Sequence, residues 1–303
     1  MTSLSDMGTL GRNLRSQGKV ITLVPTMGAL HAGHLSLVER ARDEGDALIV
    51  SIFVNPTQFA PAEDYDRYPR NLEQDLDLLK PFDPEVVFAP AATDMYLPGS
   101  STTVEPGSIA TSLEGASREG HFSGVATVVL KLLNIVHPHI AYFGQKDFQQ
   151  IAVLRHVVRD LNVNTRIRVC PTIREPDGLA ISSRNSYLTP ADRRVAPVLY
   201  RSLQQAREMF QNGQTRAGAL LDAMRSEMIR EQAVKLEYVG VVNPSTMQPV
   251  EDAIPGSAAL IAARVGPARL IDNVILGPAG ASEGELIELA LELPSSSGGT
   301  APS

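Results

Sequence analysis

Short apolar runs alternate with amphipathic stretches along the first half of the chain. Two β-branched, apolar runs, at residues 20–26 and 47–56, predict strands, and between them apolar residues recur at helical spacing up to about Gly45. The alternation continues with predicted strands at 85–90, 140–144 and 165–173 and predicted helices at 71–80, 121–138 and 147–161. Because strands joined through helices pair in parallel, we expect an α/β domain over residues 1–174, built on a doubly wound, Rossmann-like parallel sheet.

The pattern changes after Arg174. Two amphipathic helices are predicted at 191–210 and 215–232, followed by strands at turn spacing at 235–244, 257–266 and 268–276. Helices followed by neighbouring strands predict a second, smaller α+β domain over residues 175–276. From Gly277 onward the chain is rich in glycine, serine and proline, so we expect residues 277–303 to be a flexible tail.

Composition narrows the class of protein. The chain has 303 residues, 43% of them hydrophobic, which is ordinary for a folded protein with a large core. A net charge of −7 argues against binding to nucleic acid or to an anionic membrane. Cys170 is the only cysteine, no apolar run reaches transmembrane length, and the first residues lack a secretory pattern. We therefore expect a cytoplasmic protein that holds any anionic ligand by a local cluster of groups.

The stretch TMGALHAGH, residues 26–34, follows the first predicted strand. Gly28 allows a tight turn, Gly33 allows a ligand to approach the main chain, and a helix that starts here offers unpaired N–H groups to an anion. His31 and His34, at i and i+3, would point the same way and donate hydrogen bonds to phosphate oxygens. The alternative is an ordinary polar helix start with satisfied side chains. A zinc site is less favoured, because two histidines leave the ligand set incomplete.

Two further polar segments strengthen the prediction of an anion site. Gly144, Lys146, Asp147 and Gln150 follow another predicted strand, and residues 182–184 form a polar, basic loop near the domain boundary. Each segment alone is also compatible with a solvated surface. Together, at the carboxyl edge of one sheet, they would supply two cations, two imidazoles and several other donors, which suits a triphosphate.

Six motifs in order, PTMGALHAGH, SIFVNPTQF, YPR, HFSGV, FGQKDFQQ and ISSRNSYL, resemble the pantothenate synthetase (pantoate–β-alanine ligase) family. HAGH by itself resembles only the HxGH element of the wider nucleotidyltransferase superfamily. The resemblance implies an AMP-forming ligase that condenses pantoate with β-alanine through pantoyl adenylate and releases AMP and pyrophosphate. The product is pantothenate, a precursor of coenzyme A. It also implies ATP as substrate, Mg²⁺ accompanying ATP, and a homodimer.

The resemblance also implies roles for individual residues. His31, His34, Lys146 and Arg184 match catalytic positions, with His34 in the proton-donor position towards the leaving pyrophosphate. Gln58 and Gln150 match the two glutamines that hold pantoate. The implied ATP contacts are Met27, Gly28, Ala29, Leu30, His31, Ala32, Gly33, His34, Gly144, Gln145, Lys146, Asp147, Ile173, Ile181, Ser182, Ser183 and Arg184. The chain departs from the family at Glu119, because the family commonly has proline there.

Three questions stay open at the level of sequence. Asp75 is a candidate metal ligand, although on a capped surface helix a solvated side chain is the favoured interpretation. An adenylyltransferase of the same superfamily would leave AMP on its acceptor, and a non-catalytic nucleotide sensor would bind ATP without turnover. We also expect the second domain to act as a lid that excludes water from the adenylate.

Overall fold

The computed structural model describes residues 1–60 and 63–292, and these residues form two compact units. The first unit comprises residues 1–175 together with 181–186. The second comprises residues 176–180 and the described residues from 187 onward. The short loop 181–186 thus belongs to the first unit, although it follows the predicted domain boundary after Arg174 in the sequence.

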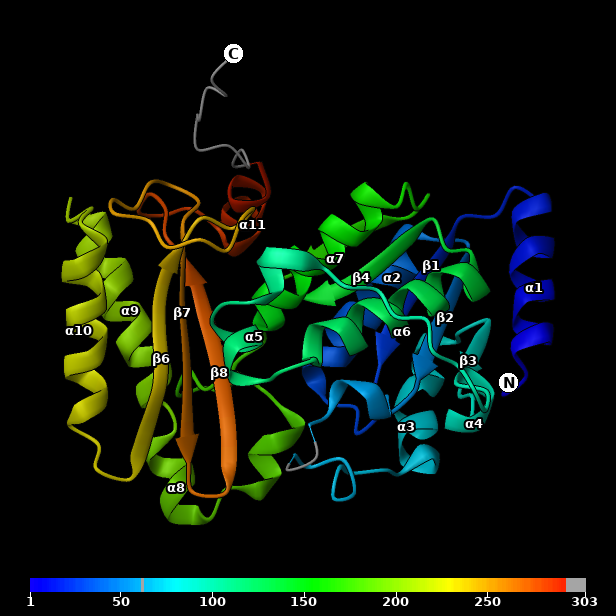
Figure 1. Ribbon diagram of the computed structural model, residues 1–303, viewed down its shortest axis with the longest axis horizontal. Helices are drawn as coiled ribbons and strands as arrows, with labels where there is room; N and C mark the ends of the chain where they lie inside the picture. Colours follow the sequence, from blue (N-terminus) through cyan, green and yellow to red (C-terminus); the bar gives the residue numbers. More distant parts are fainter. Residues whose placement is uncertain (61–62, 293–303) are drawn as a thin grey trace. The chain divides into compact units, whose positions relative to one another are not determined.

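A five-stranded sheet forms the centre of the first unit, and all of its strands are parallel (Figure 1). The strand order is β3-β2-β1-β4-β5, and Leu23 of β1 pairs with Ile49 of β2 on one side and with Ala141 of β4 on the other. This arrangement confirms the predicted doubly wound sheet. The strands are β1 Ile21–Thr26, β2 Ala47–Ile52, β3 Val86–Phe88, β4 Ile140–Gly144 and β5 Arg166–Cys170.

Helices cover both faces of this sheet. Leu23 and Ile49 share a core cluster with residues of α1, α6 and α7, whereas Val24 and Val50 share another with residues of α2 and α3. The helices are α1 Leu4–Ser16, α2 Ala32–Glu44, α3 Leu72–Leu79, α6 His121–Val136 and α7 Phe148–Asp160, with short elements η1 Pro56–Gln58, η2 Lys80–Phe82, α4 Ala92–Met95, η3 Gly107–Ala110, α5 Glu114–Ser117, η4 Gln145–Asp147 and η5 Ser183–Tyr187. Helix α1 was not predicted from the sequence, although Ser3 caps it and Met7 and Leu14 are buried at helical spacing.

The order of the strands reverses between β1 and β4. From β1 the chain passes to β2 and β3 on one side, and it then returns to β4 on the other side of β1. In open α/β sheets, ligands bind beyond the carboxyl ends of the strands at such a switch point. The ends of these two strands, at Thr26 and Gly144, lead directly into the two segments that the sequence singled out.

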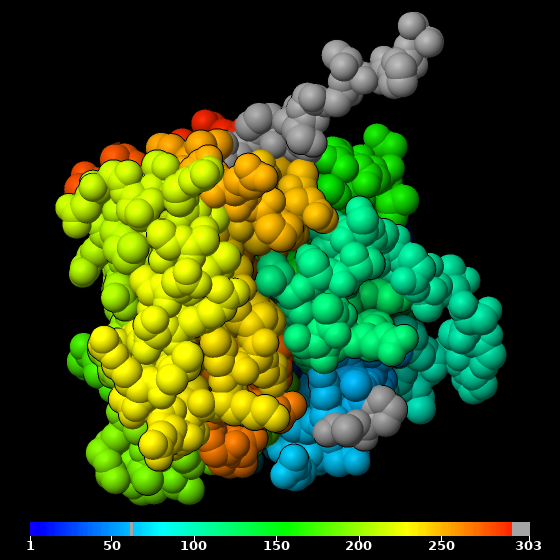
Figure 2. All heavy atoms as spheres, turned by 60° about the vertical axis from the view of Figure 1, so that its left-hand side comes forward, coloured from blue at the N-terminus to red at the C-terminus, as the bar shows by residue number. Residues whose placement is uncertain are grey.

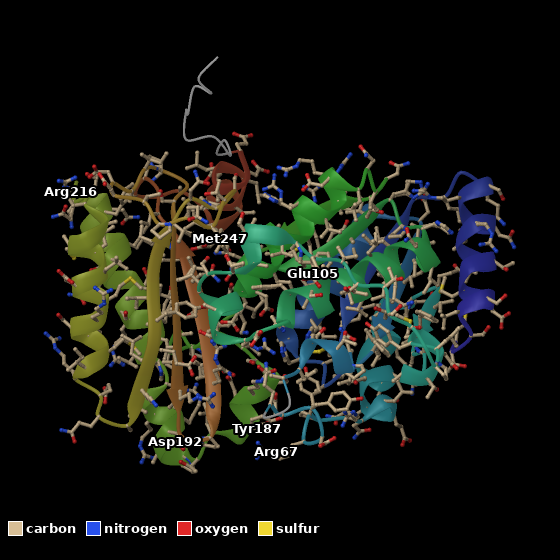
Figure 3. The ribbon with its side chains drawn as sticks, viewed as in Figure 1. Arg67, Glu105, Tyr187, Asp192, Arg216 and Met247 are labelled. Carbon is tan, nitrogen blue, oxygen red and sulfur yellow. The ribbon has the colours of Figure 1, made fainter. Side chains whose placement is uncertain are left out.

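The second unit is an antiparallel sheet with two long helices on one face. Its strands are β6 Val234–Val242, β7 Ala258–Val265 and β8 Ala268–Ile275. Leu203 of α9 (Val198–Gln211), Leu220 of α10 (Ala217–Ile229) and Ile261 of β7 belong to one buried cluster. Figure 2 shows α10 and β6 as a continuous surface, and Figure 3 places Arg216 at the start of α10 and Asp192 in α8 (Pro190–Val195). This unit confirms the predicted α+β domain.

The predicted flexible tail is wrong for part of its length. Residues Glu283–Glu292 form helix α11, and Leu286, Ile287 and Ala290 are buried on one side of it. The composition of the segment obscured this apolar spacing and the cap at Ser282, whose hydroxyl accepts a hydrogen bond from the main-chain N–H of Glu285. Residues 293–303 of the predicted tail lie outside the described residues. None of the described helices is long and apolar enough to cross a bilayer.

Candidate active site

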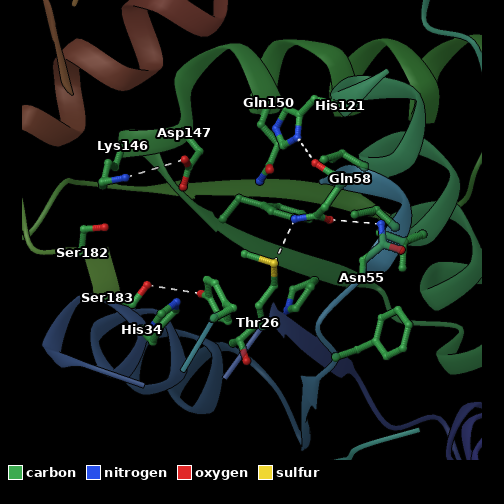
Figure 4. Close-up of a pocket in the computed structure, with 18 of the residues that line it drawn as sticks. Thr26, His34, Asn55, Gln58, His121, Lys146, Asp147, Gln150, Ser182 and Ser183 are labelled. Carbon is green, nitrogen blue, oxygen red and sulfur yellow. Dashed lines mark hydrogen bonds and ion pairs between the residues drawn. The ribbon is translucent and has the colours of Figure 1, made fainter. Parts of the chain in front are cut away.

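A pocket of the first unit lies beyond the carboxyl ends of β1 and β4, at the switch point of the sheet (Figure 4). Each of the segments singled out in the sequence contributes to its wall. Of the predicted site residues, those that line the pocket are Met27, His31, His34, Gln58, Lys146, Asp147, Gln150, Ile181, Ser182, Ser183 and Arg184. The histidines of the HAGH stretch and both predicted cations thus share one cavity.

The loop before α2 has an unusual backbone that a buried carboxylate supports. Gly28 and Ala29 have φ values of 79° and 50°, in the region that favours glycine. The two carboxylate oxygens of Asp75 accept hydrogen bonds from the main-chain N–H groups of Ala29, at 3.0 Å, and Leu30, at 2.8 Å. Asp75 is only 2% exposed, so the predicted solvated side chain is wrong. Because both oxygens accept hydrogen bonds from the loop, the geometry gives Asp75 the role of a loop support.

His31 and His34 lie together at the start of α2, with ring centroids 4.0 Å apart. The Nδ1 atoms of both rings are buried and have no hydrogen-bond partner among the described residues. Desolvation, followed by the charge of Lys146, lowers the pKa of His31 to about 4. Desolvation, followed by the proximity of His31 and Lys146, lowers the pKa of His34 to about 3. Both imidazoles are therefore neutral near pH 7, each with one N–H donor.

The two predicted cations reach the pocket from different elements. Lys146, in η4, lies with its Nζ 3.8 Å from Oδ1 of Asp147. Arg184, in the 181–186 loop, forms two parallel hydrogen bonds with Asp64, at 2.9 and 2.8 Å. Although burial opposes it, this ion pair raises the pKa of Arg184, so the guanidinium stays charged in the pocket. The ring of Tyr68 lies beside it, with its centroid 6.0 Å from the guanidinium carbon.

Gln58 and Gln150 face the same cavity from η1 and α7 (Figure 4). The Nδ2 amide of Asn55 donates to Oε1 of Gln58 at 3.1 Å, which fixes the direction of the Gln58 amide. Nε2 of Gln58 donates to Sδ of Met27, a weak acceptor, at 2.9 Å. A ligand oxygen that replaced this sulfur would receive a stronger hydrogen bond.

Similar proteins agree on one family. A family model described as pantoate-beta-alanine ligase matches residues 1–275. The pantothenate synthetase of Thermotoga neapolitana is 52% identical over 275 residues, which cover 91% of this chain and 98% of that protein. The pantothenate synthetase of Roseiflexus castenholzii is 54% identical over 256 residues, which cover 84% and 92%, respectively.

Solved structures agree as well. The crystal structure of pantothenate synthetase from Thermus thermophilus has a TM-score of 0.87 and 43% identity, covering 92% of this chain and 99% of that one. Pantoate-beta-alanine ligase from Francisella tularensis, complexed with beta-gamma ATP and beta-alanine, has a TM-score of 0.75 and 40% identity, covering 91% and 96%, respectively. This chain belongs to the pantoate–β-alanine ligase family. It is therefore an enzyme that forms pantothenate from pantoate and β-alanine.

Several predicted residues of this pantoate–β-alanine ligase do not line the pocket. Ile173 accepts a main-chain hydrogen bond from Ile181 at 3.0 Å and so supports the 181–186 loop. Glu119, the departure from the family pattern, lies exposed before Gly120, and His121 still reaches the pocket. The predicted residues that do not line the pocket are Gly28, Ala29, Leu30, Ala32, Gly33, Gly144, Gln145, Ile173 and Asp75.

Several side chains that line the pocket of this ligase were not predicted from the sequence. Asn55, Tyr68 and His121 lie within the motifs that carry the family resemblance, so a signal for them was present. Arg118 lies just outside these motifs, shortly before His121 in the chain. No sequence pattern pointed to Asp64 as a site residue, because its role depends on Arg184, which is 120 residues away in the sequence.

Proposed function

We propose that this ligase acts in two steps at the pocket of the first unit. A carboxylate oxygen of pantoate attacks the α-phosphorus of ATP, the bond from that phosphorus to the bridging oxygen breaks, and pyrophosphate leaves. The amine nitrogen of β-alanine then attacks the carbonyl carbon of pantoyl adenylate, AMP leaves, and the amine loses a proton. The observation that carries this proposal is the convergence of His31, His34, Lys146 and Arg184 with two glutamines in one cavity.

The first step needs alignment and charge neutralisation more than it needs a base. A carboxylate is already ionised at neutral pH, whereas negative charge accumulates on the leaving pyrophosphate. Since His31 and His34 are neutral in the pocket, we assign the positive charge to Lys146 and Arg184. The two imidazoles then act as N–H donors to phosphate oxygens, and His34 keeps the proposed position towards the leaving group. Met27–His34, Gly144–Asp147, Ile173 and Ile181–Arg184 form the proposed ATP contacts.

Gln58 and Gln150 are the proposed ligands of pantoate. An amide can donate to a carboxylate and accept from a hydroxyl, so two amides read both groups of a hydroxy acid. The position of Gln58 supports this role, because Asn55 holds its oxygen and leaves its nitrogen directed at the cavity. Apolar groups that line the same cavity, including Val125 and Phe143, suit the dimethyl carbon of pantoate.

Mg²⁺ is proposed to arrive with ATP and to offset phosphate charge. Among the residues that the structure describes, no group of three or more histidine, cysteine, aspartate or glutamate side chains is arranged to hold a metal ion. Asp147 is the carboxylate in the pocket beside Lys146, while Asp75 is committed to the loop. Phosphate oxygens and water suit Mg²⁺ as its main ligands, so we assign no step of the reaction to a protein-bound metal.

Further properties of the ligase are also proposed. We expect a homodimer in the cytoplasm, and light scattering should give twice the chain mass of 32.6 kDa. A monomer mass at micromolar concentration would contradict the dimer. Closure of the second unit as a lid over the adenylate stays a prediction.

The decisive experiment is pantoate-dependent exchange of labelled pyrophosphate into ATP, followed by measurement of AMP after β-alanine is added. The proposal requires both exchange and AMP release. An adenylyltransferase would release no AMP, and a nucleotide sensor would bind ATP without exchange. The variant Lys146→Met should lose exchange, whereas Lys80→Met, which removes an exposed lysine on the same unit, should retain it. Absence of exchange in the folded wild-type protein would refute the proposal.

A further inference from the structure

Arg118 and His121 line the pocket, yet both direct their polar atoms at other groups of the protein. Nδ1 of His121 lies 2.8 Å from the main-chain carbonyl oxygen of Gln58. A terminal nitrogen of Arg118 donates to the same carbonyl at 3.3 Å. His121, the first residue of α6, and Arg118, which directly follows α5, thus both hold the residue whose amide faces the cavity.

The contacts of His121 define its tautomer. A guanidinium can only donate, so Nε2 of His121 accepts a hydrogen bond from Arg118 at 3.0 Å. The proton of the neutral ring therefore lies on Nδ1, which donates to the carbonyl of Gln58. Burial, followed by the charge of Arg118, lowers the pKa of His121 to about 4, which agrees with a neutral ring.

Arg118 is itself held by carboxylates. Its Nε and a terminal nitrogen donate to the two oxygens of Glu63, both at 2.7 Å, and Glu114 lies 3.6 Å away on another side. The main-chain N–H of Glu114 in turn donates to Gln149 of α7 at 3.0 Å. Because its charge is balanced and its N–H groups are engaged, Arg118 is poorly suited to bind a substrate anion, although it lies in the pocket wall.

We infer that Arg118 and His121 are positioning residues of the pantoate site, which act by fixing the main chain at Gln58. The inference rests on the proposed role of Gln58 in holding pantoate. Asn55 orients the Gln58 amide, and His121 and Arg118 fix the backbone that carries it. The site thereby presents a preorganised amide, so pantoate does not have to order this segment when it binds.

Three substitutions separate this role from general stability. In His121→Asn the amide nitrogen takes the place of Nδ1 and keeps the donor to Gln58, whereas His121→Leu removes the donor. Arg118→Lys keeps the charge beside Glu63 but cannot bridge Glu63, His121 and the Gln58 carbonyl together. The matched controls are His137→Asn and Arg159→Gln, at positions outside the pocket. The readouts are kcat and the KM values of pantoate and ATP in the exchange assay, with melting temperatures to verify folding.

Loss of the hydrogen bond to the Gln58 carbonyl should weaken the binding of pantoate and leave the binding of ATP nearly unchanged. We expect His121→Leu and Arg118→Lys to raise the KM of pantoate roughly ten- to hundredfold and to leave the KM of ATP within about twofold of wild type. His121→Asn should stay within about threefold of wild type for both substrates. If His121→Leu does not fold, the comparison of Arg118→Lys with His121→Asn still tests the inference.

Other outcomes overturn the inference. An unchanged KM of pantoate, equal changes for both substrates, or a His121→Asn variant as impaired as Arg118→Lys would each contradict positioning through Gln58. A wild-type protein without exchange would instead refute the proposed function, so the two failures are distinguishable.

Discussion

Replacement of Asp75 by asparagine tests how the loop before α2 is held in place. In the native protein both oxygens of Asp75 accept hydrogen bonds, from the N–H groups of Ala29 and Leu30. Asparagine has nearly the same shape but only one acceptor, so its NH₂ group would face one of the two N–H groups. A Cβ added to Gly28 would lie 2.8 Å from the carboxylate, so little space exists for the side chain to rearrange.

The magnitude follows from the contacts. A hydrogen bond to a charged group contributes roughly 1.5–3 kcal/mol, and an unsatisfied buried donor costs about 1–3 kcal/mol. The loop also holds Ala29 at a φ of 50°, which an unsupported alanine would leave. We expect part of the lost free energy to appear as weaker nucleotide binding. The KM of ATP should rise about ten- to hundredfold, which is equivalent to about 1.4–2.8 kcal/mol. The rest of the lost free energy should destabilise the fold and lower the melting temperature by about 2–4 °C per kcal/mol.

The assay compares Asp75→Asn with Asp77→Asn, which changes an exposed residue on the same helix. Pyrophosphate exchange at saturating pantoate gives the KM of ATP for each variant, and thermal unfolding gives its stability. Asp77→Asn should match wild type in both. If Asp75→Asn also matched wild type in the KM of ATP, the argument that this carboxylate shapes the nucleotide site would be refuted. A selective rise in the KM of pantoate would refute it equally.

Three further predictions follow from the site. His34→Leu, which removes the N–H donor, should lower kcat for exchange roughly a hundred- to thousandfold, and His137→Asn should not; comparable kcat values would argue against a donor role. Because the pKa values of the three pocket histidines (His31, His34 and His121) are lowered to about 4, 3 and 4 from 6.5, the unfolded chain binds more protons below pH 6.5. The melting temperature should therefore fall between pH 6.5 and 4.5, and a flat profile there would be inconsistent with neutral histidines. Gly124→Ala would place a Cβ 2.3 Å from the carbonyl oxygen of Thr57, which directly precedes Gln58. The variant should therefore have a lower melting temperature and a higher KM of pantoate than wild type. Gly218→Ala, with open space around its Cβ position in α10, should stabilise the protein by about 0.4–1 kcal/mol. A Gly218→Ala variant less stable than the Gly124→Ala variant would contradict this prediction.

Periodicity predicted the sheets well, because burial imposes a pattern on each strand and helix separately. The strand at 20–26 and the helix after it were predicted from local residues alone, and the structure has β1 and α2 there. Where composition outweighed spacing, the prediction failed. The apolar residues of α11 recur at helical spacing, but the glycine-, serine- and proline-rich composition around them led to the prediction of a flexible tail.

The supports of the site were beyond the reach of local patterns. Asp75 has the sequence environment of a surface helix residue, and only the fold shows that it approaches a loop 45 residues away. The same holds for Asp64, whose partner Arg184 is 120 residues distant. Sequence motifs indicate which residues belong to a site. Contacts between distant segments decide which of these residues remain available to a ligand.

This distinction matters most for the charge of the pocket. Arg118 and Arg184 both line it, yet Glu63 and Asp64 balance them, and the two histidines of the HAGH stretch are neutral. If ATP binds in this pocket as proposed, its triphosphate would therefore not meet a strongly cationic cavity. In the proposed site it would meet N–H donors at the start of α2, Lys146 beside Asp147, and a guanidinium that it would share with Asp64. In a protein of net charge −7, such a site discriminates by the placement of donors, since a diffuse positive field would attract any anion.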